Sequence, residues 1–232
     1  GYGLHIIAFQ KLRWTGEGSV KVGNYTLFYG GTDTHHLGTG FLVRNSATAA
    51  LRKVEFVNDR LSYAIFSGGG AIIIVNTNAL TEDKNDDVKD MFYDDLETST
   101  YDNLETYDVK LLLGYCNAKV GREAVFRPTI ETESLHEQSN DNGVRLIFFA
   151  TSHDLLEFQH KYPQVHVDIP DGNTDNVLID KRRHTNIQDV RAYRVADCDP
   201  DHTLVIAKLR ERLSVAHHRK ASTEMQKFDV DK

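Results

Sequence analysis

The chain has 232 residues, of which 40% are hydrophobic and 26% charged, and a formal net charge of -7 at pH 7. A chain of this length can bury a core without disulfide bonds, and its two cysteines do not have the spacing of a zinc site. The acidic charge argues against nucleic-acid binding through the overall electrostatic field, so such a partner requires a local site. No apolar run approaches the length of a membrane span, and scarce cysteine favours an intracellular compartment, nuclear or cytoplasmic rather than secreted.

The first third of the chain predicts β-sheet. Residues 4–10 form a nearly continuous apolar run, as in a strand that is buried on both faces. Further short apolar runs, each bounded by Gly or Asn, follow at 25–29, 40–43, 61–66 and 71–75. The last two runs are separated by three glycines at 68–70 and therefore predict a hairpin.

Apolar residues recur at helical spacing in two later segments, which predicts two helices, the first of them on the outside of the fold. In 82–96 these residues are Val88, Met91, Phe92 and Leu96. In 143–155 they are Val144, Ile147, Phe148 and Thr151. Polar residues at 140–142 supply a cap for the second helix.

Further strands are predicted by apolar runs at 109–113, 177–179, 190–193 and 204–209. Helices interspersed among many strands indicate a layered α/β protein. After Leu209 the chain becomes polar, so we expect one domain over 1–209 and a disordered tail over 210–232. The chain opens at Gly1 without an initiator Met or a leader sequence, which predicts a fragment of a longer polypeptide.

An acid-rich turn at 197–202 precedes the last predicted strand. Its carboxylates, together with His202, can hold a divalent cation and a proton-transfer group side by side. Asp and Pro are also ordinary turn residues, so a plain turn is the more common explanation for these residues alone.

Two further polar residues stand at the ends of apolar runs. Asn117 follows a strand and a glycine, where its amide could donate to a phosphoryl oxygen or merely fit a tight turn. Asp175 precedes the strand at 177–179, in a position where surface Asp is common. Basic residues at 181–183 and 208–212 could contact phosphate or form a solvated face.

Six sequence segments, which occur in order along nearly the whole chain as far as Leu209, carry a resemblance to a known family. They are FQKLRWTGEG (9–18), GTGFLV (38–43), VNTNALTE (75–82), LLLGYCNAKVG (111–121), NDNGVRL (140–146) and DPDHTLVIAKL (199–209). Together they resemble the endonuclease/exonuclease/phosphatase superfamily, in particular its craniofacial development protein 2-like branch and the endonuclease domains of non-LTR retrotransposons. The resemblance implies an α+β sandwich, in which two mixed β-sheets pack face to face with helices outside and the family's N-terminal strand is missing.

The resemblance also implies a phosphodiesterase site for DNA or RNA at one end of the sheets, dependent on Mg2+ or Mn2+. His202 matches the family's site histidine, Asp201 the acid before it that can contact metal, and Asn117 the Asn of an Asp-x-Asn motif. Asp175 matches the Asp that orients the histidine, and Asn78 stands where the family has a residue that touches the phosphate.

The same matching places a lysine and a tyrosine at acidic positions. Lys11 stands at the position of the metal-binding Glu, and Tyr115 where an Asp is expected. An ammonium about 4 Å from a divalent ion would be repelled by roughly 8 kcal/mol at an effective dielectric constant of about 20. The resemblance therefore implies an endonuclease whose activity in this chain is weak or absent.

Three functions remain open on the sequence. The first is an endonuclease-like domain with a degraded metal site and impaired phosphodiester hydrolysis. The second is a working Mg2+-dependent endonuclease in which Asp175, Asp199 and Asp201 bind the ion in a shifted arrangement. The third is a non-catalytic binding or scaffold domain whose acidic surface meets a protein partner.

Overall fold

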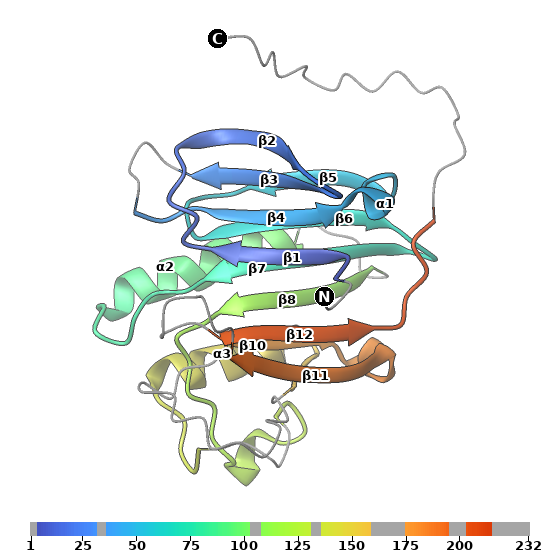
Figure 1. Ribbon diagram of the computed structural model, residues 1–232. Helices are drawn as coiled ribbons and strands as arrows, with labels where there is room; N and C mark the ends of the chain where they lie inside the picture. Colours follow the sequence, from blue (N-terminus) through green and yellow to red (C-terminus); the bar gives the residue numbers. More distant parts are fainter. Residues whose placement is uncertain are drawn as a thin grey trace.

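The computed structural model describes residues 4–31, 36–102, 108–130, 136–158, 175–194 and 203–214. Its strands form one large sheet and two smaller sheets (Figure 1). The strands are β1 (Ile6–Gln10), β2 (Gly16–Val22), β3 (Tyr25–Gly31), β4 (Thr39–Arg44), β5 (Leu51–Phe56), β6 (Leu61–Ser67), β7 (Ala71–Asn78), β8 (Val109–Tyr115), β9 (Leu155–Phe158), β10 (Asp175–Asp180), β11 (Ile187–Arg194) and β12 (Thr203–Leu209). The helical segments are α1 (Asn45–Thr48), α2 (Asp86–Leu96), the π-helix η1 (Glu97–Asp102), α3 (Asp141–Ser152) and the 3-10 turns η2 (Ala124–Phe126) and η3 (Lys181–Asn186).

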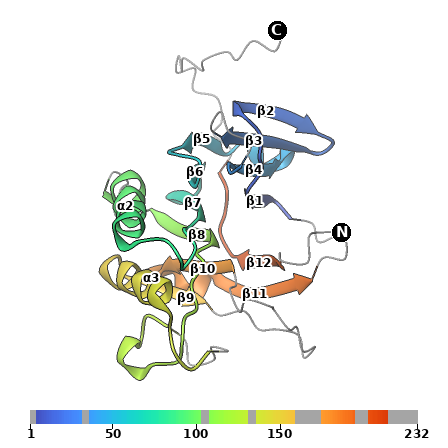
Figure 2. The same cartoon turned by 90° about the vertical axis from the view of Figure 1, so that its left-hand side faces the viewer.

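The large sheet has the strand order β5-β6-β7-β8-β10-β9, and β7 and β8 are its parallel pair. The hairpin expected around the three glycines is confirmed as β6 and β7. Two antiparallel sheets, β1-β4-β3-β2 and β11-β12, cover one face of the large sheet, whereas α2 and α3 cover the other (Figure 2). The expected sandwich of sheets with helices outside is confirmed, and one of its layers is divided into these two smaller sheets.

The centre of the large sheet is buried on both faces, which explains its continuous apolar sequence. In β7, Ile72 and Ile74 pack toward the smaller sheets, whereas Ile73 and Val75 pack toward the helices. A strand covered on both sides has no solvated face and so shows no apolar and polar alternation. Each apolar run predicted as a strand corresponds to a strand of the structure, although residues 4 and 5 precede β1. The expectation that this first run is buried on both faces is wrong, because β1 is an edge strand and its residues are half-buried.

The helix predicted within 82–96 is confirmed as α2, but its predicted buried face is partly wrong. Its buried residues are Lys89, Phe92 and Leu96, whereas Val88 is 42% and Met91 is 65% exposed. Lysine is counted as polar in a hydropathy pattern, yet its alkyl stem can cover apolar surface while the ammonium finds a charged partner. The face therefore includes Lys89 and turns away from Met91.

The second predicted helix is confirmed as α3, and the cap expected at 140–142 is provided by Asn140, whose side chain accepts a hydrogen bond from the Gly143 amide. Its predicted end at 155 is wrong, because the chain has already entered β9 there. Phe148, expected on the buried face, is 62% exposed, whereas Phe149 is buried. The apolar face is thus rotated by one residue from the predicted one.

Three strands were not predicted from the sequence: β2, β5 and β9, although β9 (LLEF) is apolar and its first residue was assigned to the preceding helix. Each is an edge strand of its sheet. An edge strand is less covered than a central one and tolerates polar residues, as in the mostly exposed β2. The sequence pattern therefore found the central strands and missed these edges.

The chain remains attached to the sandwich beyond β12. The Arg210 amide donates to the carbonyl of Asn186, the Ser214 amide donates to the carbonyl of Ser67, and Leu213 packs against the core between the sheets. The rest of the predicted tail, 215–232, lies outside the described residues. In the described ranges, no helix combines the length and the apolar character needed to cross a membrane.

At Gly114 the backbones of β7 and β8 approach so closely that only glycine fits. Its φ is +138°, and a Cβ at this position would lie 2.1 Å from the carbonyl oxygen of Thr77. We expect Gly114→Ala to lower the free energy of unfolding by about 3 kcal/mol or more, measured by urea unfolding with circular dichroism. Gly69→Ala is the control, because a Cβ there meets no atom within 4 Å, and its effect should stay within about 0.5 kcal/mol. Equal effects of the two changes would contradict this packing.

Candidate functional site

Polar or aromatic residues lie side by side at one end of the central strands of the large sheet. Asn78, the last residue of β7, pairs with Tyr115, the last residue of β8, and Tyr115 pairs in turn with Asp175 at the start of β10. Since side chains alternate along a strand, Asn78 and Tyr115 point to the same side as Ile74 and Leu111, toward the smaller sheets.

Lys11 reaches this place from the opposing layer. It follows β1, which ends on the same side of the molecule as β7 and β8 (Figure 1). Its Nζ lies 5.3 Å from the centroid of the Tyr115 ring. Asn117 follows Tyr115 by two residues and is buried. We call Lys11, Asn78, Tyr115 and Asn117 the strand-end cluster.

Asn76 fixes the position of β1 behind this cluster. It is fully buried, and its side-chain amide donates to the carbonyls of Phe9, at 2.9 Å, and Gly40, at 3.2 Å. Its Oδ1 accepts a hydrogen bond of 2.6 Å from Nε2 of Gln10. Asn76 thus joins the two layers, and its bond to Gln10 anchors the residue directly before Lys11.

The backbone at this end of the sandwich is unusual. Among the described residues four non-glycine residues have positive φ, and three of them are Lys11 (56°), Arg13 (58°) and Asn117 (50°). Asparagine tolerates this conformation, whereas lysine and arginine adopt it at a cost of order 1 kcal/mol. The connection after β1 is held by hydrogen bonds from the amides of Leu12 and Arg13 to the carbonyls of 38 and 37. Such strain is typical of functional loops.

The side chain of Asn117 is hydrogen-bonded to the loop that follows β7. Its side-chain amide donates to the Ala79 carbonyl at 2.7 Å, and its own carbonyl accepts from Nδ2 of Asn142 at 3.1 Å. Asn142 also donates to the Leu80 carbonyl at 3.0 Å. The loops that leave β7 and β8 are therefore tied to each other and to the first turn of α3.

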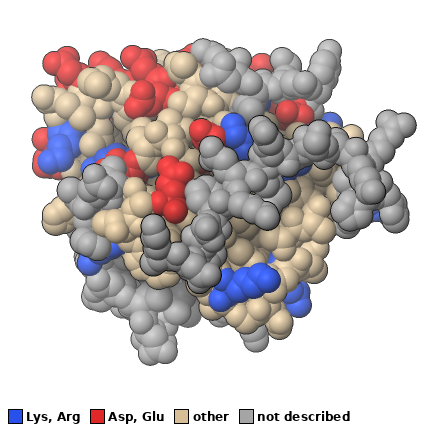
Figure 3. Space-filling model, turned by 90° about the horizontal axis from the view of Figure 1, so that it is seen from above, with Lys and Arg blue, Asp and Glu red and all other residues tan. Residues whose placement is uncertain are grey.

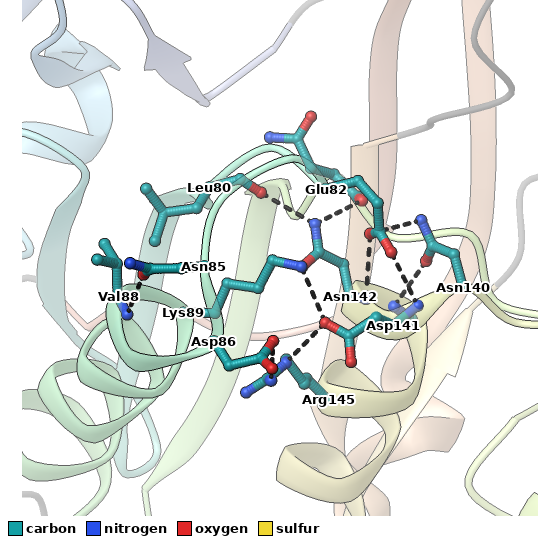
Figure 4. A network of polar contacts seen from close by, with 12 residues as sticks. Leu80, Glu82, Asn85, Asp86, Val88, Lys89, Asn140, Asp141, Asn142 and Arg145 are labelled. Atoms are coloured by element: carbon teal, nitrogen blue, oxygen red, sulfur yellow. Dashed lines mark hydrogen bonds and ion pairs between the residues drawn. The ribbon is translucent and has the colours of Figure 1, made fainter.

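Glu82 completes this network (Figure 4). Its carboxylate accepts hydrogen bonds from Nδ2 of Asn140 and from the backbone amides of Asp141 and Asn142. A carboxylate is favourable here because the first amides of a helix lack partners within the helix. Glu82 thereby fixes the start of α3 under the two loops.

A charged group between α2 and α3 supports the same arrangement. Lys89 is 4% exposed, and its Nζ lies 2.9 Å from Oδ2 of Asp141, which Arg145 also contacts through Nε at 2.9 Å. Arg145 is further paired with Asp86 and Asp90 of α2. Hydrogen bonds from Lys89 and then Arg145 lower the pKa of Asp141, and the same carboxylate is the main cause of the raised pKa of Arg145.

The structure places some of the sequence-predicted site residues together and leaves others outside its described ranges. Asn78 and Asn117 lie in the strand-end cluster, as do Lys11 and Tyr115, the two residues that the resemblance sets at acidic positions of the family. The backbone of Asp175 lies in register beside Tyr115. Asp201 and His202 lie outside the described residues, as do Asp197 and Asp199.

Several residues that build this site were not predicted as site residues, and those at 140 and 142 were expected only as part of a helix cap. They are Gln10, Asn76, Glu82, Lys89, Asn140 and Asn142. Asn76 carried a usable signal, because it is a polar residue inside an otherwise apolar strand. The contacts of Glu82 join segments far apart in the chain and have no local signature.

The described residues of the strand-end cluster do not fit the Mg2+ ion that the resemblance implies. Mg2+ prefers carboxylate and other oxygen ligands in a near-octahedral shell. The cluster offers two amides, a phenol and an ammonium, and Arg60 adds a second cation beside it by donating to the Asn78 carbonyl at 3.1 Å. Within the described ranges no three His, Cys, Asp or Glu side chains come together as a metal site would need.

Comparison with known sequences gives two distant relatives, and no family model matches the chain. The chain is 26% identical over 223 residues to craniofacial development protein 2 of Bos taurus and to that of Tragulus javanicus. The match covers 91% of this chain but 37% and 38% of those proteins. The chain thus spans little more than a third of the length of the curated relatives it matches.

Comparison with solved structures finds nuclease folds. An AP endonuclease from Archaeoglobus fulgidus is similar with a TM-score of 0.58 and 13% identity, over 88% of both chains. The endonuclease domain of TRAS1, a telomere-specific non-LTR retrotransposon, is similar with a TM-score of 0.53 and 11% identity, over 88% of this chain and 80% of that domain. The AP endonuclease LMAP from Leishmania major has a TM-score of 0.51 and 11% identity, over 82% of this chain and 73% of that one. The chain therefore has an endonuclease/exonuclease/phosphatase-like fold.

The charged group between the helices predicts a pH-dependent effect of Asp141→Asn. The change leaves the buried Lys89 without its carboxylate, and since Asp141 itself is partly exposed we expect a loss of about 2 kcal/mol in the free energy of unfolding at pH 7. A lowered pKa means that the carboxylate stabilises the fold above about pH 4 and loses this effect as the pH falls through the folded-state pKa. In urea titrations the difference from the parent should therefore shrink toward pH 3.

The control for this change is Asp94→Asn, on the exposed side of α2. It should alter the free energy of unfolding by less than about 0.5 kcal/mol at either pH. A loss for Asp141→Asn that is as large in acid as at neutral pH would show that charge pairing is not its cause.

Proposed function

We propose that this chain is a nucleic-acid-binding domain of nuclease fold whose phosphodiester hydrolysis is weak or absent. The observation that carries the proposal is the contact of the Lys11 ammonium with the Tyr115 ring at the end of the sandwich. These are the two positions at which the resemblance to metal-dependent endonucleases calls for acidic residues. The nuclease fold supports the substrate class, and the two replacements support the loss of activity.

The chemistry of the two side chains explains the loss. Lysine has three donors and no acceptor, so Lys11 cannot coordinate a cation. A phenol has an ordinary pKa of about 10 and is therefore protonated at neutral pH, which makes a tyrosine a poor general base there. Removal of a positioned general base typically lowers a rate by about 10^2 to 10^4.

The remaining site residues are assigned on the resemblance. His202 would steady a phosphoryl oxygen, Asp175 would orient that histidine, and Asp201 would be the acid left for a Mg2+ or Mn2+ ion. Asn78 would donate to the phosphate, and Asn117, whose amide already donates to Ala79, would do so through its second N–H. The pairing of Asp175 with Tyr115 supports this arrangement, because it brings the start of β10 to the same level as Asn78.

DNA or RNA is the proposed ligand. Among the similar structures, one is the endonuclease domain of a retrotransposon and two are AP endonucleases. Those activities belong to those proteins, and the transfer of a nucleic-acid ligand to this chain is part of the proposal.

A plasmid-nicking assay tests the proposal. Supercoiled DNA with Mg2+ or Mn2+ should be nicked little or not at all by the parent chain. The double variant Lys11→Glu/Tyr115→Asp returns both acidic groups and should raise the nicking rate by about 10^2. A control with the same change in charge, Lys21→Glu/Val22→Asp on the exposed strand β2, should leave the rate at the parent level.

Vigorous nicking by the parent that disappears in His202→Ala would contradict impaired hydrolysis and support a working endonuclease. If the double variant is inert and calorimetry detects no Mg2+ binding, the assignment of site residues is wrong.

A second candidate, a non-catalytic scaffold domain, is favoured by the surface of α2. Exposed carboxylates gather on and before this helix: Asp83, Asp86, Asp87, Asp90, Asp94 and Asp95. Acidic side chains are concentrated at the margin of the molecule where α2 lies (Figure 3). A folded chain that neither binds nor cuts nucleic acid, with or without Mg2+, would favour this function over the first.

A further inference from the structure

We infer that the strand-end cluster binds a phosphate group without a divalent metal ion, with the Lys11 ammonium supplying the positive charge. The inference rests on the proposed function and specifies the ligand chemistry of the same site. It follows from the disagreement between the metal that the resemblance implies and the side chains that the structure brings together.

Lys11 is held where a phosphate could meet it. The preceding residue, Gln10, is anchored to Asn76, and the Lys11 backbone is fixed in the left-handed region with φ 56°. Among the described residues Lys11 makes no ion pair, and its ammonium lies on the face of the Tyr115 ring. Ammonium donors form strong, charge-assisted hydrogen bonds with phosphate oxygens.

Asn78 supplies an independent indication of a ligand. Its side chain is 1% exposed, and its Nδ2 has no hydrogen-bond partner among the described residues. Buried amide donors are nearly always paired, and an unpaired one points to a water, an ion or a ligand that completes it. Asn78 lies beside Tyr115 on the same side of the sheet, so this donor faces the region into which Lys11 also reaches.

The charges of the described side chains at the cluster suit an anion. Arg60 donates from Nη1 to the carbonyl of Asn78 and so places a second cation next to the cluster. The four cluster residues themselves contain no carboxylate. Two cations and an unpaired amide donor attract the oxygens of a phosphodiester and repel a divalent cation. The acidic charge of the whole chain makes this a local site rather than a general basic surface.

Fluorescence anisotropy tests the inference with a short, fluorescein-labelled single-stranded DNA, in EDTA and in MgCl2. The parent chain should bind in EDTA, and Mg2+ should not strengthen binding. Lys11→Gln should weaken binding by about tenfold through loss of a charge-assisted contact. If Lys11 neutralises one phosphate, the slope of log K against log salt should also fall by about 0.7, a change that a purely structural role would not produce.

Two further variants keep the result interpretable. Lys11→Gly removes the ammonium at a position whose backbone conformation suits glycine, so it should fold normally and bind as weakly as Lys11→Gln. Lys21→Gln, on the exposed strand β2, removes the same charge elsewhere and should change the affinity by less than about twofold.

Each remaining outcome decides between the proposals. Binding that requires Mg2+ would overturn the metal-free site and leave the proposed nucleic-acid function standing. Binding in EDTA that is insensitive to both Lys11 variants would also overturn it, and would point to other basic residues such as those at 181–183. Absence of binding in both buffers would refute the proposed function and this inference together.

Discussion

The geometry of the candidate site depends on a buried amide, that of Asn142. Its Nδ2 donates to the carbonyls of Leu80 and Asn117, and so connects the loop after β7, the loop after β8 and the first turn of α3. A buried carbonyl left without a donor costs about 1 to 3 kcal/mol. Because Asn142 donates to a carbonyl of each loop, a movement that separates the loops would leave buried carbonyls without a donor. Asn117 adds a further link by donating to Ala79. These hydrogen bonds between the loops and α3 therefore help to fix the position of the strand-end cluster.

These polar groups can be buried because their partners are also provided by the fold. The Glu82 carboxylate accepts three hydrogen bonds at the start of α3, and Lys89 is paired with Asp141. Hydrogen bonds are directional, whereas apolar burial is not, so a satisfied network fixes one arrangement of α2, α3 and the strand ends. Against this background the unpaired Nδ2 of Asn78 is an exception, and it belongs to the last residue of β7, at the start of the loop.

Apolar patterning predicted the central strands of the large sheet but missed three of the edge strands, β2, β5 and β9. The runs that became β7 and β8 are visible because both faces of the central sheet are covered. The helix faces were partly wrong because pairing between chain segments overrides hydropathy: Lys89 is buried through Asp141, a residue 52 positions away. The candidate site was reached through ordered motifs, which placed Lys11, Asn78, Tyr115 and Asn117 at one end of a sandwich. The residues that hold them there act through contacts between segments far apart in the chain, and the local hydropathy pattern carries no information about such contacts.

Lys11 and Tyr115, which the resemblance sets at acidic positions, form a pair in the structure. An ammonium is attracted to the face of an aromatic ring by about 0.5 to 1 kcal/mol at an exposed site, so each residue gives the other a favourable neighbour. A carboxylate in place of Lys11 alone would face the negative side of the Tyr115 ring. An aspartate in place of Tyr115 alone would pair with the ammonium and be neutralised by it. Neither single change gives two free carboxylates, so an acidic site at this place requires both changes at once. A fold whose strand ends are fixed by distant hydrogen bonds can keep its architecture while this pair changes the charge of the site.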